Sequence, residues 1–175
     1  EVVIIVYLYP FFVFILAYFM LNEKINTGKI VSGVIAFLGL VIMNPFDPNS
    51  INFYGNIFAF MSAIFGALFI VWMRKESTSN YGLNATMWNF IFAAIILFPV
   101  AVIMGLDFNN LILLAALGFI SIGIAYFFLE ISLKKVNADD ASLLLLFSEP
   151  TSAILFGYLI LGEVIQFNVI LGGIF

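Results

Sequence analysis

Residues 148–163 read SEPTSAILFGYLILGE and place a carboxylate and a proline, Glu149 and Pro150, inside an otherwise apolar run. Apolar residues make up 65% of the 175-residue chain, charged residues make up 9%, and the mean hydropathy is +1.21. Soluble domains contain about 45–50% apolar and about 25% charged residues. The composition therefore predicts an all-α, polytopic membrane protein, in which a carboxylate at Glu149 needs an explanation.

Membrane spans can be located between the charged and turn residues, because about 20 apolar residues cross a hydrocarbon core of roughly 30 Å. Seven segments result, and the last of them crosses only about half of the core. They cover residues 2–21, 29–43, 54–73, 84–106, 111–133 and 138–161, with the seventh starting at 167. The sequence begins and ends inside apolar runs, so we expect it to be part of a longer protein.

All six positive charges fall in the first, third and fifth connections between these segments. Alternating spans place those connections on one side of the membrane, which the positive-inside bias assigns to the cytoplasm. We therefore expect a multi-pass protein of the cell membrane with Lys24, Lys29, Arg74, Lys75, Lys134 and Lys135 in its cytoplasmic loops. Asp47, Asp107 and Glu163 then mark the outer loops.

An internal repeat appears when Pro10 is aligned with Pro150, an offset of 140 residues. Seven identities fall within the 29 positions 7–35, and no gap is needed. The least common residue types among them are Pro10 and Pro150, Tyr18 and Tyr158, and Glu23 and Glu163. The copies lie five spans apart, an odd number, so they cross the membrane in opposite directions. Many secondary transporters are built from such inverted repeats, with the substrate site near the midplane.

Two stretches resemble the EamA domain of the drug/metabolite transporter superfamily: residues 125–163, AYFFLEISLKKVNADDASLLLLFSEPTSAILFGYLILGE, and residues 7–43, YLYPFFVFILAYFMLNEKINTGKIVSGVIAFLGLVIM. The likeness is carried by Tyr126 ahead of LKKV at 133–136, Glu149-Pro150, Gly162-Glu163, and Pro10, Glu23 and Gly39 in the first copy. One departure is Asn22, which stands where the family has glycine.

The resemblance implies ten spans in two inverted repeats of five, cytoplasmic termini, and export or exchange of small metabolites. Residues 1–45 would be the C-terminal part of the first repeat, helices four and five. Residues 53–175 would be the second repeat, helices six to nine and the start of ten.

Glu149 lies 11 residues beyond the start of its segment, about 16 Å along a helix and therefore near the middle of the bilayer. An ionised residue at the centre of the lipid face costs about 2.5–3.5 kcal/mol, so Glu149 should face a cavity or the helix bundle. Pro150 frees the carbonyl of Leu146 and bends its helix, and Pro10 frees that of Val6 in the other copy. Two interpretations stay open for Glu149: substrate binding with proton coupling, or a hydrogen bond that only packs helices.

Other polar residues in the spans are weaker candidates for the cavity. Tyr9 occupies the position of Glu149 in the first copy, and Ser121, Tyr126 and Asn89 lie in later spans. Each could equally serve helix packing or the membrane interface. The predicted binding or coupling residues are Glu149, Pro150, Pro10, Tyr9, Tyr126, Ser121 and Asn89.

Structural roles are expected for the remaining carboxylates. Glu23 and Glu163 should cap the helix that follows each of them. Glu130 is followed four residues later by Lys134, which favours a salt bridge on one helix face. Asp139 and Asp140 suit the first turn of a helix.

The composition limits the chemistry that the chain can perform. The sequence contains no Cys and no His, so disulfides, thiol nucleophiles and imidazole bases are absent, and we expect no enzyme activity, metal or cofactor. Every Lys and Arg lies in a connection, which disfavours phosphate-bearing substrates and leaves no basic face for nucleic acid. The expected partners are a neutral, zwitterionic or cationic small-molecule substrate and the lipid bilayer, and a homodimer is compatible with the sequence. A passive channel or a non-transporting scaffold is the alternative to a carrier, and an intramembrane enzyme is disfavoured.

Overall fold

The computed structural model describes residues 2–44, 52–79, 82–105 and 110–174, and every regular element in these ranges is a helix. In chain order they are α1 (Val2–Val6), α2 (Tyr9–Leu21), α3 (Thr27–Met43), α4 (Phe53–Ser77), α5 (Gly82–Ile103), α6 (Leu111–Ala116), the π-helical segment η3 (Leu117–Ile124), α7 (Ala125–Leu133), α8 (Ala138–Leu161) and α9 (Phe167–Gly173). The predicted all-α, polytopic class is confirmed. Asp47 and Asp107 lie outside the described residues.

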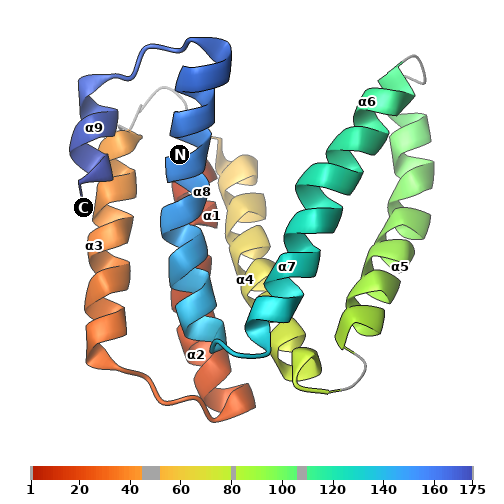
Figure 1. Cartoon of the computed structure of the whole chain (residues 1–175), viewed down its shortest axis with the longest axis horizontal. Helices are drawn as coiled ribbons and strands as arrows, with labels where there is room; N and C mark the ends of the chain where they lie inside the picture. Colours follow the sequence, from red (N-terminus) through yellow and green to blue (C-terminus); the bar gives the residue numbers. More distant parts are fainter. Residues whose placement is uncertain (1, 45–51, 80–81, 106–109, 175) are drawn as a thin grey trace. The chain divides into compact units, whose positions relative to one another are not determined.

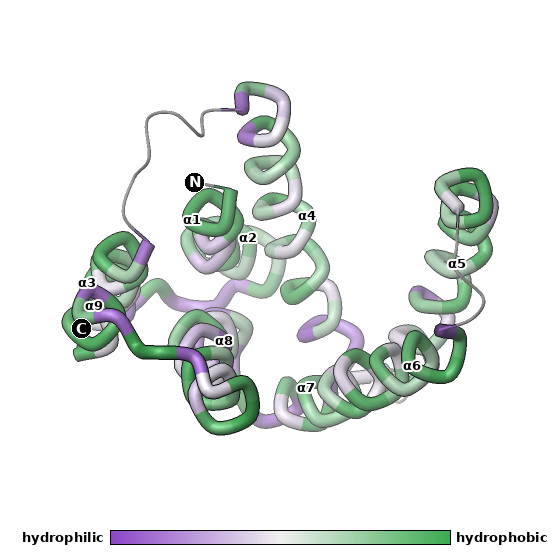
Figure 2. Tube along the Cα trace, turned by 90° about the horizontal axis from the view of Figure 1, so that it is seen from above, coloured by the Kyte–Doolittle hydropathy of each residue, from purple (hydrophilic) through white to green (hydrophobic). Residues whose placement is uncertain are grey.

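Within the described residues, five stretches are long and apolar enough to cross a membrane. They are Val2–Leu21, Phe53–Ser77, Gly82–Ile103, Leu111–Leu133 and Ala138–Leu161. The helix α3 has 17 residues, about 26 Å, and is shorter than these. Figure 2 shows hydrophobic residues along the helices and hydrophilic ones mainly at their ends and connections, as expected of helices that meet lipid.

The chain divides into two compact units, 1–71 with 137–175, and 72–136, which are described separately. In the first unit, α2 and α8 lie side by side and run antiparallel, and α3 packs against both α8 and α9 (Figure 1). The α2–α3 connection lies at one end of this unit and the α8–α9 connection lies at the other (Figure 1). These are the two stretches that the sequence repeat aligns, and the antiparallel course agrees with an inverted repeat.

The backbone of the two connections is the same at equivalent positions. After α2, Asn22 adopts a left-handed conformation (φ 55°) and the amide of Glu23 donates to the carbonyl of Ala17 at 3.2 Å. The end of α8 has the same conformation. Gly162 is left-handed (φ 67°), and the amide of Glu163 donates to the carbonyl of Gly157 at 3.2 Å. Asparagine is one of the few residues besides glycine that enters the left-handed region easily, so the substitution at position 22 keeps the helix end.

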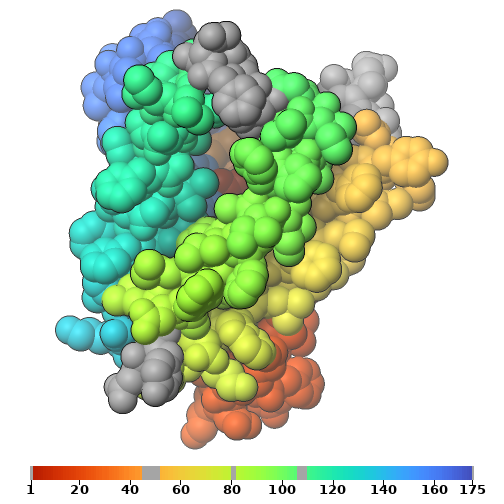
Figure 3. Space-filling view, turned by 90° about the vertical axis from the view of Figure 1, so that its right-hand side faces the viewer, coloured from red at the N-terminus to blue at the C-terminus, as the bar shows by residue number. Residues whose placement is uncertain are grey.

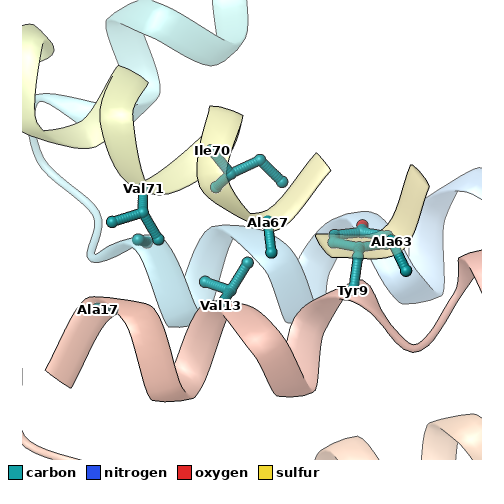
Figure 4. Packing of buried hydrophobic residues seen from close by; sticks show 8 residues of the cluster. Tyr9, Val13, Ala17, Ala63, Ala67, Ile70 and Val71 are labelled. Atoms are coloured by element: carbon teal, nitrogen blue, oxygen red, sulfur yellow. The ribbon is translucent and has the colours of Figure 1, made fainter. Parts of the chain in front are cut away.

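Small residues allow the close contacts in the first unit. Ala17 of α2 and Ala63 and Ala67 of α4 are buried and let the larger side chains of Val13 and Tyr9 fit between the helices (Figure 4). Gly172 of α9 lies so near the carbonyl oxygen of Gly39 on α3 that a Cβ would overlap it. Small residues are the usual way in which membrane helices approach closely, because lipid supplies no hydrophobic force between them.

The two prolines of the repeat have different effects on their helices. The helix is interrupted ahead of Pro10: α1 ends at Val6, and residues 7 and 8 form a turn before α2 begins. The helix α8 continues through Pro150 from Ala138 to Leu161. The matching prolines therefore mark equivalent positions without imposing the same local backbone.

Candidate functional site

Glu149 contacts Tyr7 of the first copy, a residue that was not among the predicted site residues. Its carboxylate lies close enough to the hydroxyl of Tyr7, in the turn between α1 and α2, for the two side chains to interact. The turn ahead of Pro10 thus places the phenol of Tyr7 near the carboxyl group of Glu149, at the middle of α8. A hydroxyl three residues before a proline in an apolar span was the available signal, but nothing local links it to a residue 142 positions away.

The exposure of Glu149 bears on its role. Its side chain is exposed in the described part of the chain, apart from the contact with Tyr7. A carboxylate at this depth is costly on a lipid face, so the exposed side of Glu149 favours a water-filled or protein-lined space in the complete protein. The carboxylate of Glu149 contacts one hydroxyl, that of Tyr7, and is otherwise exposed, which is compatible with ligand binding.

Tyr9 and Pro10 belong to the packed interior of the first unit. Both are buried, and Tyr9 is part of the apolar cluster formed by α2, α4 and the start of α8 (Figure 4). The hydroxyl of Tyr9 donates to the carbonyl oxygen of Ser142 on α8, at 3.4 Å. These contacts tie α2 to α8, so Tyr9 has a packing role in this structure.

Pro150 and Glu149 do not line the same cavity. Pro150 borders a cavity of about 20 Å³, large enough for one water molecule, that is lined by residues of α3, α8 and α9. Leu146, whose carbonyl Pro150 leaves without an amide partner in the helix, lines it as well. Pro150 therefore lies toward α3 and α9, whereas Glu149 lies toward the turn at Tyr7.

The other predicted site residues lie in the second unit, whose α5 and α6 present their side chains to the viewer in Figure 3. Tyr126 packs edge-on against Phe90 with ring centroids 5.2 Å apart. Both line a pocket of about 300 Å³ between α5 and α7, together with Thr86. Ser121 lies in η3 and Asn89 on α5, both exposed and neither in the lining of this pocket. A common site of these residues with Glu149 stays a prediction.

Glu130 occupies a different environment from the one predicted. Its side chain is 0% exposed, and its Oε2 accepts a hydrogen bond from the hydroxyl of Thr86 at 2.8 Å, while Oε1 has no hydrogen-bond partner among the described residues. The predicted salt bridge with Lys134 is wrong, because Lys134 is exposed and the carboxylate turns inward to α5. Gly82 makes room for it, since a Cβ there would overlap Oε1. Helical spacing alone could not reveal a partner on another helix.

Glu23 caps a helix, but not the predicted one. Its Oε2 accepts a hydrogen bond from the amide of Ala138, the first residue of α8, at 3.1 Å. Lys29 on α3 adds ion pairs to Asp139 at 2.9 Å and Asp140 at 2.8 Å in the same turn of α8. The N-cap of the following helix, α3, is Asn26, whose side chain accepts a hydrogen bond from the amide of Gly28. The prediction that Glu23 caps that helix is therefore wrong, and the acidic first turn of α8 pairs with Lys29 of the first copy.

Comparisons with known proteins identify the family of this chain. The sequence profile described as the EamA-like transporter family matches residues 1–44 and 53–175. An "Uncharacterized transporter" of Clostridium kluyveri is 31% identical over 173 residues, which cover 91% of this chain and 55% of the relative.

Two further relatives cover nearly all of the chain. An "Uncharacterized transporter" of Archaeoglobus fulgidus is 27% identical over 97% of this chain and 62% of its own length. The "Uncharacterized transporter YoaV" of Bacillus subtilis is 25% identical over 98% of this chain and 61% of its own length. The chain thus spans less than two thirds of the length of these relatives, and no solved structure matches it significantly.

Proposed function

Because the chain belongs to the EamA-like transporter family, we propose that the full-length protein is a secondary transporter that moves a small solute by alternating access, in efflux or exchange. Residues 1–45 form the end of the first repeat, and 53–175 form the second repeat up to the start of its last helix. The antiparallel course of α2 and α8, with their matching helix ends, supports this division.

The observation that carries the proposal is the contact between Glu149 of the second copy and Tyr7 of the first. An ionisable residue within a span usually belongs to a substrate or ion pathway. Here it contacts Tyr7 of the other copy, and a change in the relative position of the two copies would make or break this contact. Binding of solute or of a proton at Glu149 could therefore change which side of the membrane the site opens to.

The charges of the chain support a proposal for the class of solute. All six lysines and arginines lie near helix ends or in connections, whereas Glu149 is the carboxylate at the middle of its helix. A phosphate group would find a negative residue and no arginine fork there. A neutral, zwitterionic or cationic solute is therefore proposed, with Glu149 and Tyr7 as its polar contacts. The end of the first unit with Lys24 and Lys29 faces the cytoplasm in this proposal.

Counterflow in proteoliposomes tests the function. Full-length protein is reconstituted into vesicles loaded with a candidate amine or amino acid, and labelled solute of the same kind is added outside. A carrier is expected to accumulate the label transiently above its equilibrium level, because unlabelled solute leaving the vesicle returns the site to the outside. Flux of solute that only follows the gradient would identify a passive channel, and no flux with any solute of this class would identify a scaffold.

A further inference from the structure

The connection between α2 and α3 holds the start of another helix. In this connection, which we call the Glu23 seat (residues 22–29), the carboxylate of Glu23 accepts the amide of Ala138, and Lys29 pairs with Asp139 and Asp140. The first amides of a helix have no partner within the helix, and a carboxylate near them also benefits from the helix dipole. The seat therefore fixes the N-terminus of α8 by chemistry specific to helix starts.

A pocket of about 270 Å³ lies at the equivalent connection between α8 and α9. We call it the Glu163 seat, and its lining residues are Ile154, Tyr158, Glu163, Val164, Ile165, Gln166 and Val169. Subtracting the offset of 140 from the positions of Glu163 and Val169 gives Glu23 and Lys29, the two residues that hold α8. The pocket thus occupies the place that a helix start fills in the other copy.

The carboxylate of Glu163 has room to move within this seat. In the structure it folds back over α8, where Oε2 lies 2.8 Å from the position that a Cβ on Gly157 would take. The equivalent of Gly157 in the first copy is Ala17, which has a Cβ, and there the carboxylate of Glu23 reaches the amide of Ala138 instead. The two carboxylates differ in direction as expected if one has a helix start to bind.

We propose that, in the full-length protein, the Glu163 seat receives the N-terminal turn of the helix that continues into residues 2–21. The repeat register assigns the counterparts of Ala138, Asp139 and Asp140 to the three positions directly upstream of Glu1, and the relatives of this chain are longer than it is. Glu163 accepts a hydrogen bond from a backbone amide of that turn. The inference rests on the proposed repeat division.

The two seats have unequal charge. Lys29 gives the Glu23 seat two ion pairs, whereas its counterpart Val169 can form none. The helix start at the Glu163 seat is then held without those ion pairs.

Paired cysteines in a cysteine-free background of the full-length protein test the seat. One pair joins Val169→Cys to a cysteine directly upstream of Glu1, and the matched control joins Lys29→Cys to Asp140→Cys, whose native side chains are 2.8 Å apart. A second control replaces Val169→Cys by Ile170→Cys, the exposed neighbour outside the pocket lining. A short bifunctional thiol reagent is added, and cross-linked peptides are quantified by mass spectrometry.

The Val169 pair is expected to cross-link several-fold more than the Ile170 pair and as readily as the Lys29 control. In samples whose Lys29 control reacts, absence of the Val169 cross-link would overturn the inference, and so would equal reaction of the Ile170 pair. Counterflow is measured separately on the unmodified protein. A protein that cross-links as expected but fails in counterflow would reject the transport proposal and leave the seat supported.

Discussion

Glu149→Gln is expected to abolish pH-driven transport in the full-length protein while leaving its amount in the membrane unchanged. Glutamine keeps the size of the side chain and can still bond to Tyr7, but it cannot bind and release a proton. Initial uptake into proteoliposomes under an imposed pH gradient is the measurement.

Two variants serve as controls for Glu149→Gln. Glu163→Gln changes a carboxylate at a helix end and should leave coupling to the pH gradient in place. Tyr7→Phe removes the partner hydroxyl but keeps the titrating group, so uptake should still respond to the pH gradient but be slower than in the wild type, because the contact between the two copies is lost. Unaltered pH-driven uptake by Glu149→Gln would reject the coupling role of this residue.

Gly82→Ala is expected to destabilise the protein strongly. The added Cβ would overlap the carboxylate of Glu130 and lie 2.8 Å from Cα of Ser77 and 2.9 Å from the carbonyl oxygen of Glu76. Two of these are backbone atoms that cannot rotate away, and overpacking of this kind costs about 1–3 kcal/mol. The midpoint of thermal unfolding in detergent should fall clearly below that of the wild type.

Gly66→Ala provides the matched control for this prediction. Gly66 lies inside α4, and a Cβ there meets no atom of the described residues within 4 Å apart from the neighbouring backbone of its own helix. Because alanine is favoured over glycine in helices, this variant should unfold at the same temperature as the wild type or slightly above it. Equal unfolding temperatures for Gly82→Ala and Gly66→Ala would contradict the tight packing assigned to Gly82 and Glu130.

The helices were predictable from the sequence because their lengths follow from hydropathy, which is a local property. The expected spans 2–21, 111–133 and 138–161 agree with the structure to the residue. The repeat was predictable as well, because Pro, Tyr and Glu recur at one offset, and the equivalent left-handed residues Asn22 and Gly162 occupy matching helix ends.

The contacts made by the carboxylates were not predictable, because each joins residues that are far apart in the chain. Helical spacing pointed from Glu130 to Lys134, whereas the hydrogen bond comes from Thr86. Local capping rules predicted that Glu23 caps the next helix, whereas its carboxylate accepts a hydrogen bond from the amide of Ala138 on α8. Periodicity within one helix contains no information about which neighbouring helix faces a given side chain.

Cysteine labelling of the two equivalent connections tests the central claim, that the two copies cross the membrane in opposite directions. Ile25 and Ile165 are related by the repeat offset, are both exposed, and carry no charge whose removal could change the orientation. Ile25→Cys and Ile165→Cys are placed singly in a cysteine-free full-length protein and treated with a membrane-impermeant thiol reagent in intact cells. Ile165→Cys is expected to be labelled directly and Ile25→Cys only after permeabilisation. Labelling of both from the same side would contradict the central claim.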